Sequence, residues 1–130
     1  MNRPMRVIGL LIHVAVAGMM LIAGLGKTFG FAPPEIITKM NAIGFGDKLV
    51  LIGMGETISA VLLLIPRTLS LGTLLVSGFW GGVICVHLGR HEPITIWAGM
   101  LIVTWLGAWL RLPATFASLY ASPTLPSRAL

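Results

Sequence analysis

The sequence predicts an all-α, polytopic membrane protein: an antiparallel bundle of four transmembrane helices with a short interfacial helix between the first two. Hydrophobic residues make up 56% of the 130 residues, charged residues only 10%, and the mean hydropathy is +0.95. A soluble protein could not cover its surface with so few charges. The apolar runs are continuous rather than alternating with polar residues, which excludes a transmembrane β-barrel. The length fits a single membrane domain over residues 1–130.

One apolar run, residues 49–65, carries Glu56 near its centre. At ~1.5 Å per residue this run forms ~25 Å of helix, close to the thickness of the hydrocarbon core of a bilayer. A charged side chain at that depth costs ~2.5–3.5 kcal/mol on insertion scales, which is tolerable only where the group faces other protein. The rest of the chain is therefore expected to supply a partner for Glu56.

Three further transmembrane helices are predicted, over about residues 7–26, 69–88 and 94–110. The first follows two arginines, as a signal peptide would. Its apolar run of ~20 residues exceeds the usual ~7–15 of a signal core and has no small-x-small cleavage site, so we expect a retained helix. A tight reversal at Pro66 and a short charged loop connect the later helices.

Two shorter segments are predicted at the membrane surface. Pro33-Pro34-Glu35 is typical of a helix start, and the segment Glu35–Ala42 places its apolar residues near one face. We therefore expect an amphipathic interfacial helix there. The tail, residues 113–130, is expected to be irregular, with Ala114–Tyr120 as a candidate for one more interfacial helix.

The basic residues divide between the two sides of the predicted bundle. The side of both termini holds five and no acids: Arg3, Arg6, Arg67, Arg111 and Arg128. The opposite side holds four: Lys27, Lys39, Lys48 and Arg90. The positive-inside rule counts Lys and Arg, so the termini are predicted to be cytoplasmic. The net charge of +5 favours an anionic lipid surface as partner, and nothing resembles a nucleic-acid-binding face.

The single cysteine, Cys85, lies in an apolar run and is expected to be a small buried core residue. One cysteine excludes an internal disulfide, a CxxC redox pair and a cysteine-based metal site. No nucleophile–base pair, metal-ligand spacing or phosphate-binding loop appears either. We therefore predict neither a metal site nor an enzyme that acts by itself.

Two helices carry small residues on the same face as their polar groups. In the first helix this face holds His13, Ala17, Met20, Gly24 and Lys27. In the helix of Glu56 it holds Leu49, Gly53, Glu56, Ala60 and Leu63. Small residues let helix backbones approach closely in lipid, so these two faces are the predicted contact seam. Gly78 and Gly82 in the third helix are a further, common packing signal.

Depth decides which polar groups can meet. Glu56 lies ~10 Å below the membrane surface opposite the termini, and Lys27 and His87 end their helices at that surface. Side chains tilt toward the start of their own helix, so these three groups are expected to converge. Lys27, Glu56 and His87 are the candidate ligand or proton site. His13 lies ~21 Å from Lys27 along the helix and is expected to be a separate polar core group.

Each of these residues also has a plainer interpretation. Lys27 can extend to lipid head groups, and His87 can be satisfied by water or a backbone carbonyl. Lys27 and Glu56 can form a purely structural clamp. Trp80, on the face of His87 one heptad earlier, is a supporting residue whose role packing alone would explain.

The order of these landmarks resembles the DoxX-like membrane proteins. The segments that carry the resemblance are AGLGKTFG (23–30), GMGETISAVLLLIPRT (53–68), LGTLL (71–75) and VICVHL (83–88). It covers about residues 21–88 and implies a small, multi-pass protein of a bacterial inner membrane. Lys27, Glu56, Arg67 and His87 match the polar landmarks of the family, without an assigned catalytic role. The family is often linked to quinone-level redox chemistry, so the resemblance implies quinone as cofactor and redox-complex subunits as partners.

Three functions remain open. The first is a subunit or accessory of a quinone-linked redox system, with a pocket for a quinone head group or a small anion. This chain alone is expected to hold no cofactor: two bis-histidine haems need four histidines, and only His13 and His87 lie in the spans. The second is a structural or assembly protein, and a homo-oligomer is open in either case. The third is a small proton-coupled transporter, but such proteins carry their glutamate in the first helix, where this chain has His13.

Overall fold

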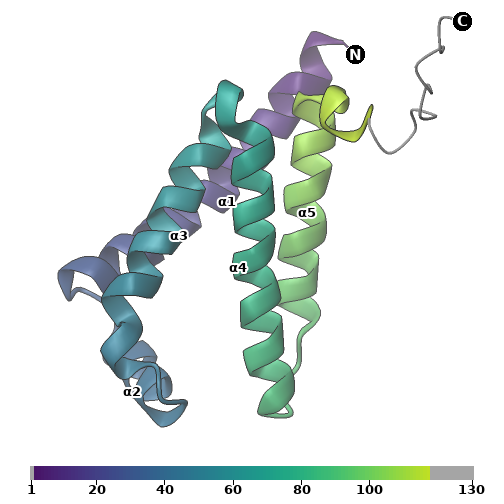
Figure 1. The fold of residues 1–130 in the computed structure, drawn as a ribbon. Helices are drawn as coiled ribbons and strands as arrows, with labels where there is room; N and C mark the ends of the chain where they lie inside the picture. Colours follow the sequence, from purple (N-terminus) through teal and green to yellow (C-terminus); the bar gives the residue numbers. More distant parts are fainter. Residues whose placement is uncertain (1, 118–130) are drawn as a thin grey trace, which may run out of the picture.

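The computed structural model describes residues 2–117, and all regular structure in that range is helical (Figure 1). The α-helices are α1 (Arg3–Phe29), α2 (Pro34–Ala42), α3 (Leu49–Leu64), α4 (Leu69–Gly89) and α5 (Thr95–Arg111). Three 3-10 turns join or follow them: η1 (Gly46–Lys48), η2 (Pro66–Thr68) and η3 (Pro113–Phe116). Of the helix expected at 114–120, residues 114–116 lie in the 3-10 turn η3. Arg128 and the other residues after 117 lie outside the described part of the chain.

The predicted helices are all present, and α1 is longer than predicted at both ends. It begins with a proline in its first turn, where the missing N–H has no helical partner to lose. It ends at Gly30, which adopts a left-handed conformation with φ of 79° and donates its N–H to the carbonyl of Gly26. The predicted interfacial segment is helical as α2, and its position at a membrane surface stays a prediction.

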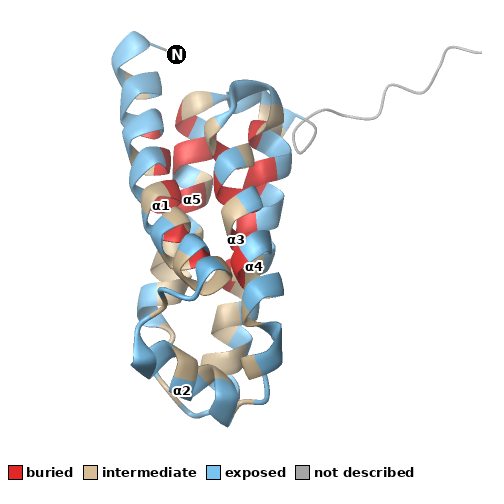
Figure 2. Cartoon of the chain, turned by 90° about the vertical axis from the view of Figure 1, so that its left-hand side faces the viewer, coloured by how far each residue is buried: buried red, intermediate tan, exposed pale blue. Residues whose placement is uncertain are grey.

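The four longer helices stand side by side, with neighbours in opposite directions (Figure 1). α1 packs against α3 and α5, and α4 packs against the same two helices. α2 lies at the end where α1 finishes and α3 begins (Figure 2). Within the described residues, α1 and the segment Pro66–Gly89 are long and apolar enough to cross a membrane. α3 and α5 have 16 and 17 residues, ~24–26 Å of helix against a hydrocarbon core of ~30 Å.

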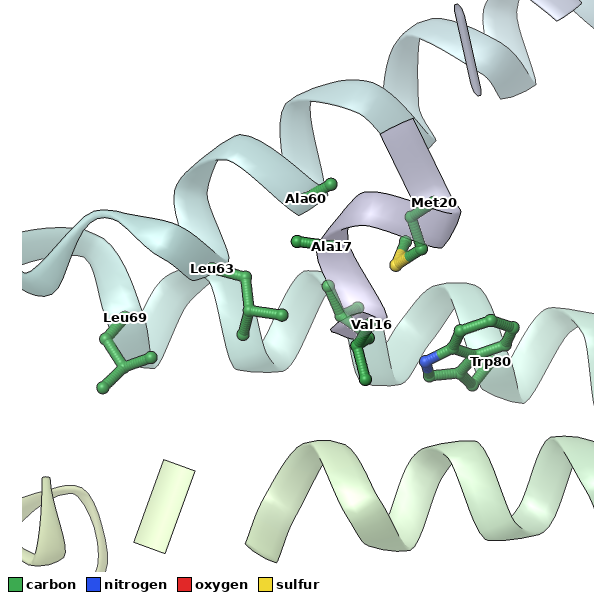
Figure 3. Packing of buried hydrophobic residues seen from close by; sticks show 8 residues of the cluster. Val16, Ala17, Met20, Ala60, Leu63, Leu69 and Trp80 are labelled. Atoms are coloured by element: carbon green, nitrogen blue, oxygen red, sulfur yellow. The ribbon is translucent and has the colours of Figure 1, made fainter. Parts of the chain in front are cut away.

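The buried residues lie on the sides of the long helices that face one another (Figure 2). Many large apolar residues are exposed on the exterior. The core cluster consists of Val16, Ala17, Met20, Ala60, Leu63, Leu69, Val76 and Trp80 (Figure 3). Examples on the exterior are Ile22, Leu51 and Ile102, with exposed fractions of 79%, 69% and 67%. An exterior this apolar suits contact with lipid.

The outer face of α4 corrects one prediction. Cys85 was expected to be buried, and it is exposed. The buried residues of α4 recur at helical spacing as Leu69, Gly72, Thr73, Val76 and Trp80, so position 85 falls on the opposite face. Gly78 and Gly82 are also exposed, and a Cβ at either would meet nothing within 4 Å. The close approach of α4 to α3 is at Gly72 instead, where a Cβ would overlap the backbone of Leu63.

Candidate functional site

The predicted seam between α1 and α3 is present, and it is a backbone-to-backbone contact. A Cβ on Gly24 would lie 2.9 Å from the carbonyl oxygen of Gly53, and a Cβ on Gly53 would lie 2.6 Å from that of Gly24. Only glycine permits this approach at either position. One helical turn further along each helix come Lys27 and Glu56, so the glycine contact brings these two side chains together.

Lys27 and Glu56 form a buried ion pair. The ammonium Nζ of Lys27 donates a hydrogen bond of 2.6 Å to the carboxylate Oε2 of Glu56. The two side chains are 12% and 3% exposed. Lys27 therefore turns inward to the acid rather than outward to lipid head groups. Such charge-assisted hydrogen bonds are stronger than neutral ones, and a cation in the last turn of α1 also complements its helix dipole.

The ion pair borders a cavity of about 330 Å³, to which α1, α2, α3, α4 and α5 all contribute. Six charged or titratable side chains line it: Lys27, Lys39, Glu56, His87, Arg90 and Glu92. The remaining wall is apolar and includes Phe79, Trp80 and Trp97. α2 borders the cavity through Ile36, Lys39 and Met40. The site is thus an apolar, aromatic chamber with a few polar groups, as small-molecule sites commonly are.

Three aromatic rings and one imidazole form one wall of this cavity. Trp80 and Trp97 are stacked, with ring centroids 5.9 Å apart and planes at 22°. Phe79 meets Trp80 edge-on at 5.1 Å, and His87 lies 5.1 Å from Trp97. Trp80 is 2% exposed and lies beside Val16 in the core (Figure 3). Trp97 has its ring against Trp80 and borders the cavity.

His87 lines the same cavity but contacts other groups. Its Nδ1 lies 2.9 Å from the carbonyl oxygen of Val83. A carbonyl can only accept, so Nδ1 carries the proton. Its Nε2 lies 3.6 Å from Oε2 of Glu92. The other carboxylate oxygen of Glu92, Oε1, accepts a hydrogen bond of 2.9 Å from Nε of Arg90. Among the described contacts, His87 bonds to neither Lys27 nor Glu56. The three groups that were expected to converge therefore all line one cavity, but only Lys27 and Glu56 contact each other.

His13 belongs to a second polar cluster, near the other end of the bundle. It is 0% exposed, and its Nε2 donates to the carbonyl of Thr104 at 2.9 Å. Its Nδ1 accepts a hydrogen bond of 2.9 Å from Arg111. The Arg111 guanidinium also donates to the carbonyls of Leu63 and Leu64, at 2.8 and 2.9 Å. Arg111 thereby caps carbonyls that the end of α3 leaves without helical partners.

Sequence reasoning assigned the supporting residues with mixed results. His13 is separate from the ion pair, as the depth comparison predicted. Arg67 is exposed in the η2 turn at the end away from the cavity, so the structure does not bring it to Glu56. Arg111 had been counted as a surface charge, and nothing in its helix marks it as a partner of His13. Among the described residues, no group of three or more His, Cys, Asp or Glu is placed to hold a metal ion.

The comparisons with known proteins identify the family. No curated protein and no solved structure matches the chain. A family model does match: the DoxX-like family, over residues 11–111. The match extends beyond the landmarks at 21–88 and includes α5, so it covers most of the chain, both polar clusters and nearly the whole cavity. The resemblance noted in the sequence is confirmed, and the chain belongs to the DoxX-like family.

Proposed function

We propose that this protein crosses the membrane with α1, α3, α4 and α5 and binds the head group of a quinone, or a small anion, in the cavity beside Lys27 and Glu56. It would then serve as an integral subunit or accessory of a quinone-linked redox system in a prokaryotic inner membrane. Family membership and the apolar helices make it a membrane protein. The observation that carries the proposal is that the ion pair borders an aromatic-lined cavity of about 330 Å³ instead of being sealed between helices.

The composition of the cavity suits a flat, weakly polar ring. The stacked pair Trp80 and Trp97 offers an aromatic surface, and Lys27 offers a hydrogen-bond donor to a carbonyl oxygen. Oxidation of a quinol releases two protons, and the carboxylate of Glu56 and the imidazole of His87 are groups that accept protons. His13 and His87 are too few to hold two bis-histidine haems, so we propose that a partner protein with its own cofactor carries the electrons.

A Glu56→Gln variant should lower the quinone-linked respiratory activity of membranes that contain the protein, because an amide cannot take up the proton. The matched control is Glu35→Gln on α2, which removes an exposed acid that does not line the cavity. Activity is measured in membranes with equal amounts of each variant. Unchanged activity of the Glu56→Gln membranes, at equal amounts, would contradict the proposal.

Direct binding gives a second test. A soluble short-chain quinone should bind the purified protein saturably, and Trp97→Leu should weaken that binding about two- to twelvefold because it removes an aromatic contact worth ~0.5–1.5 kcal/mol. Trp109→Leu is the control, because Trp109 is 46% exposed and does not line the cavity. Binding is followed by quenching of the remaining tryptophans. Equal affinity for both variants would place the quinone elsewhere.

A structural role is the second candidate, and the geometry of the seam favours it specifically. Lys27 and Glu56 lie one turn beyond the Gly24–Gly53 contact, where an ion pair can set the register of α1 against α3. A buried ionic pair can specify a packing without taking part in chemistry. In that case the pair can be replaced as a unit without loss of function, which the double variant Lys27→Met with Glu56→Gln tests.

A further inference from the structure

A second polar cavity lies at the end of the bundle away from the ion pair. Its volume is about 310 Å³. Two arginines line it, Arg6 from α1 and Arg111 from the end of α5. The other lining residues are apolar: Leu10, Leu64, Pro66, Leu69 and Leu112. The cavity therefore combines two guanidinium groups with a hydrocarbon wall.

No acidic side chain lies in this cavity to neutralise the two arginines. Its sequence contains only four acidic residues. They are Glu35 on α2, Asp47 in η1, Glu56 in the ion pair and Glu92 beside His87. None of them lines this cavity. The acidic side chains therefore leave Arg6 and Arg111 without a counter-ion in this cavity, so an external anion can bind there.

Arg111 is held in a fixed position with donors to spare. Its Nη1 donates to His13 and to the carbonyl of Leu63, and its Nη2 donates to the carbonyl of Leu64. A guanidinium has five N–H donors, so two remain. The carbonyl end of α3 offsets part of the positive charge. A guanidinium that is already immobilised loses little entropy when it binds an anion, and its fork geometry matches the oxygens of a phosphate.

We propose that this cavity binds the phosphate group of an anionic lipid, with Arg6 and Arg111 as its ligands and the leucines in contact with the acyl chains. The apolar wall favours a lipid over free phosphate, because inorganic phosphate would leave those leucines without a hydrophobic partner. Basic pockets between transmembrane helices are known to bind acidic head groups in this way. The inference rests on the membrane assignment alone and is independent of any quinone in the other cavity.

The test uses the full chain reconstituted in phosphatidylcholine vesicles with trace spin-labelled lipids. We expect the native protein to prefer phosphatidylglycerol over phosphatidylcholine, and Arg6→Gln to reduce that preference about fivefold, because it removes a charge-assisted hydrogen bond to the lipid phosphate. Arg6→Lys keeps the charge and should retain most of the preference. The control is Arg67→Gln, an exposed arginine at the same end that does not line the cavity. At about 0.15 M salt its loss should be under about twofold, because an exposed charge outside the site is screened and makes no fixed contact with the lipid.

Three results would overturn the proposal. An equal loss for Arg6→Gln and Arg67→Gln would show general attraction to an anionic surface, and no loss for Arg6→Gln would remove the site. A third arm adds millimolar inorganic phosphate: displacement of the labelled lipid assigns the cavity to free phosphate and refutes the lipid, whereas no displacement supports it. Arg6 is exposed, so its variants should fold, which circular dichroism checks. None of these results bears on quinone binding beside Glu56.

Discussion

Lys27→Met is expected to lower the free energy of unfolding by ~3–5 kcal/mol, because it leaves the Glu56 carboxylate buried without a cation. The Lys27 ammonium is the group that donates to this carboxylate, at 2.6 Å, and the Glu56 side chain is 3% exposed. Unfolding is measured by circular dichroism as a denaturing detergent is added to the protein in a mild one.

The double variant Lys27→Met with Glu56→Gln decides what the pair is for. Both charges are then absent, so most of the lost stability should return, because no unpaired charge remains buried. If the double variant also keeps full activity in membranes, the pair is a structural clamp and the proposed ligand site is wrong. Lys39→Met is the control for loss of a positive charge at the cavity, since Lys39 is exposed; it should change stability by less than ~0.5 kcal/mol. A Lys27→Met protein as stable as the native one would contradict the ion pair itself.

Gly53→Leu is expected to lower the free energy of unfolding by about 3 kcal/mol or more, because the new side chain overlaps backbone atoms, which cannot change rotamer to make room. Even its Cβ would lie 2.6 Å from the carbonyl oxygen of Gly24 and 2.8 Å from the Cβ of Lys27. To accommodate it, α1 and α3 must separate, which also breaks the ion pair with Glu56. The same detergent titration measures this loss.

Gly55→Leu is the matched control for that variant. It adds the same side chain to the same helix two residues later, where a Cβ meets nothing within 4 Å. Its effect on stability should be small and of either sign, because helix propensity improves and no contact is lost. Equal destabilisation by the two variants would show that the Gly24–Gly53 contact is not what joins α1 to α3.

The pairing of Lys27 with Glu56 could be predicted because it depends on properties of single helices. The depth of Glu56 follows from its distance to the start of α3, and the depth of Lys27 from its place at the end of α1. Helical periodicity then shows which small residues share a face with each. A buried carboxylate is unfavourable unless a cation lies beside it, so a basic partner is expected. These constraints agree, so the contact follows without coordinates.

The His13–Arg111 contact could not be predicted in the same way. The two residues are 98 positions apart, and they meet because α5 packs against α1 rather than only against α4. Periodicity within one helix does not specify which helices are neighbours. The same limit applies to Trp97, whose ring reaches Trp80 because α4 and α5 are adjacent.

The sequence by itself therefore determined the helices, the apolar exterior, the family and the α1–α3 seam with its ion pair, because each depends on hydropathy, helical spacing and the cost of burying charge. Only the tertiary structure decided that the ion pair borders a cavity, that His87 faces Glu92 and that Cys85 is exposed. The physical reason is that a cavity is the volume left between helices. Its size and lining depend on the neighbours and the angles of several helices together, and no single stretch of sequence carries them.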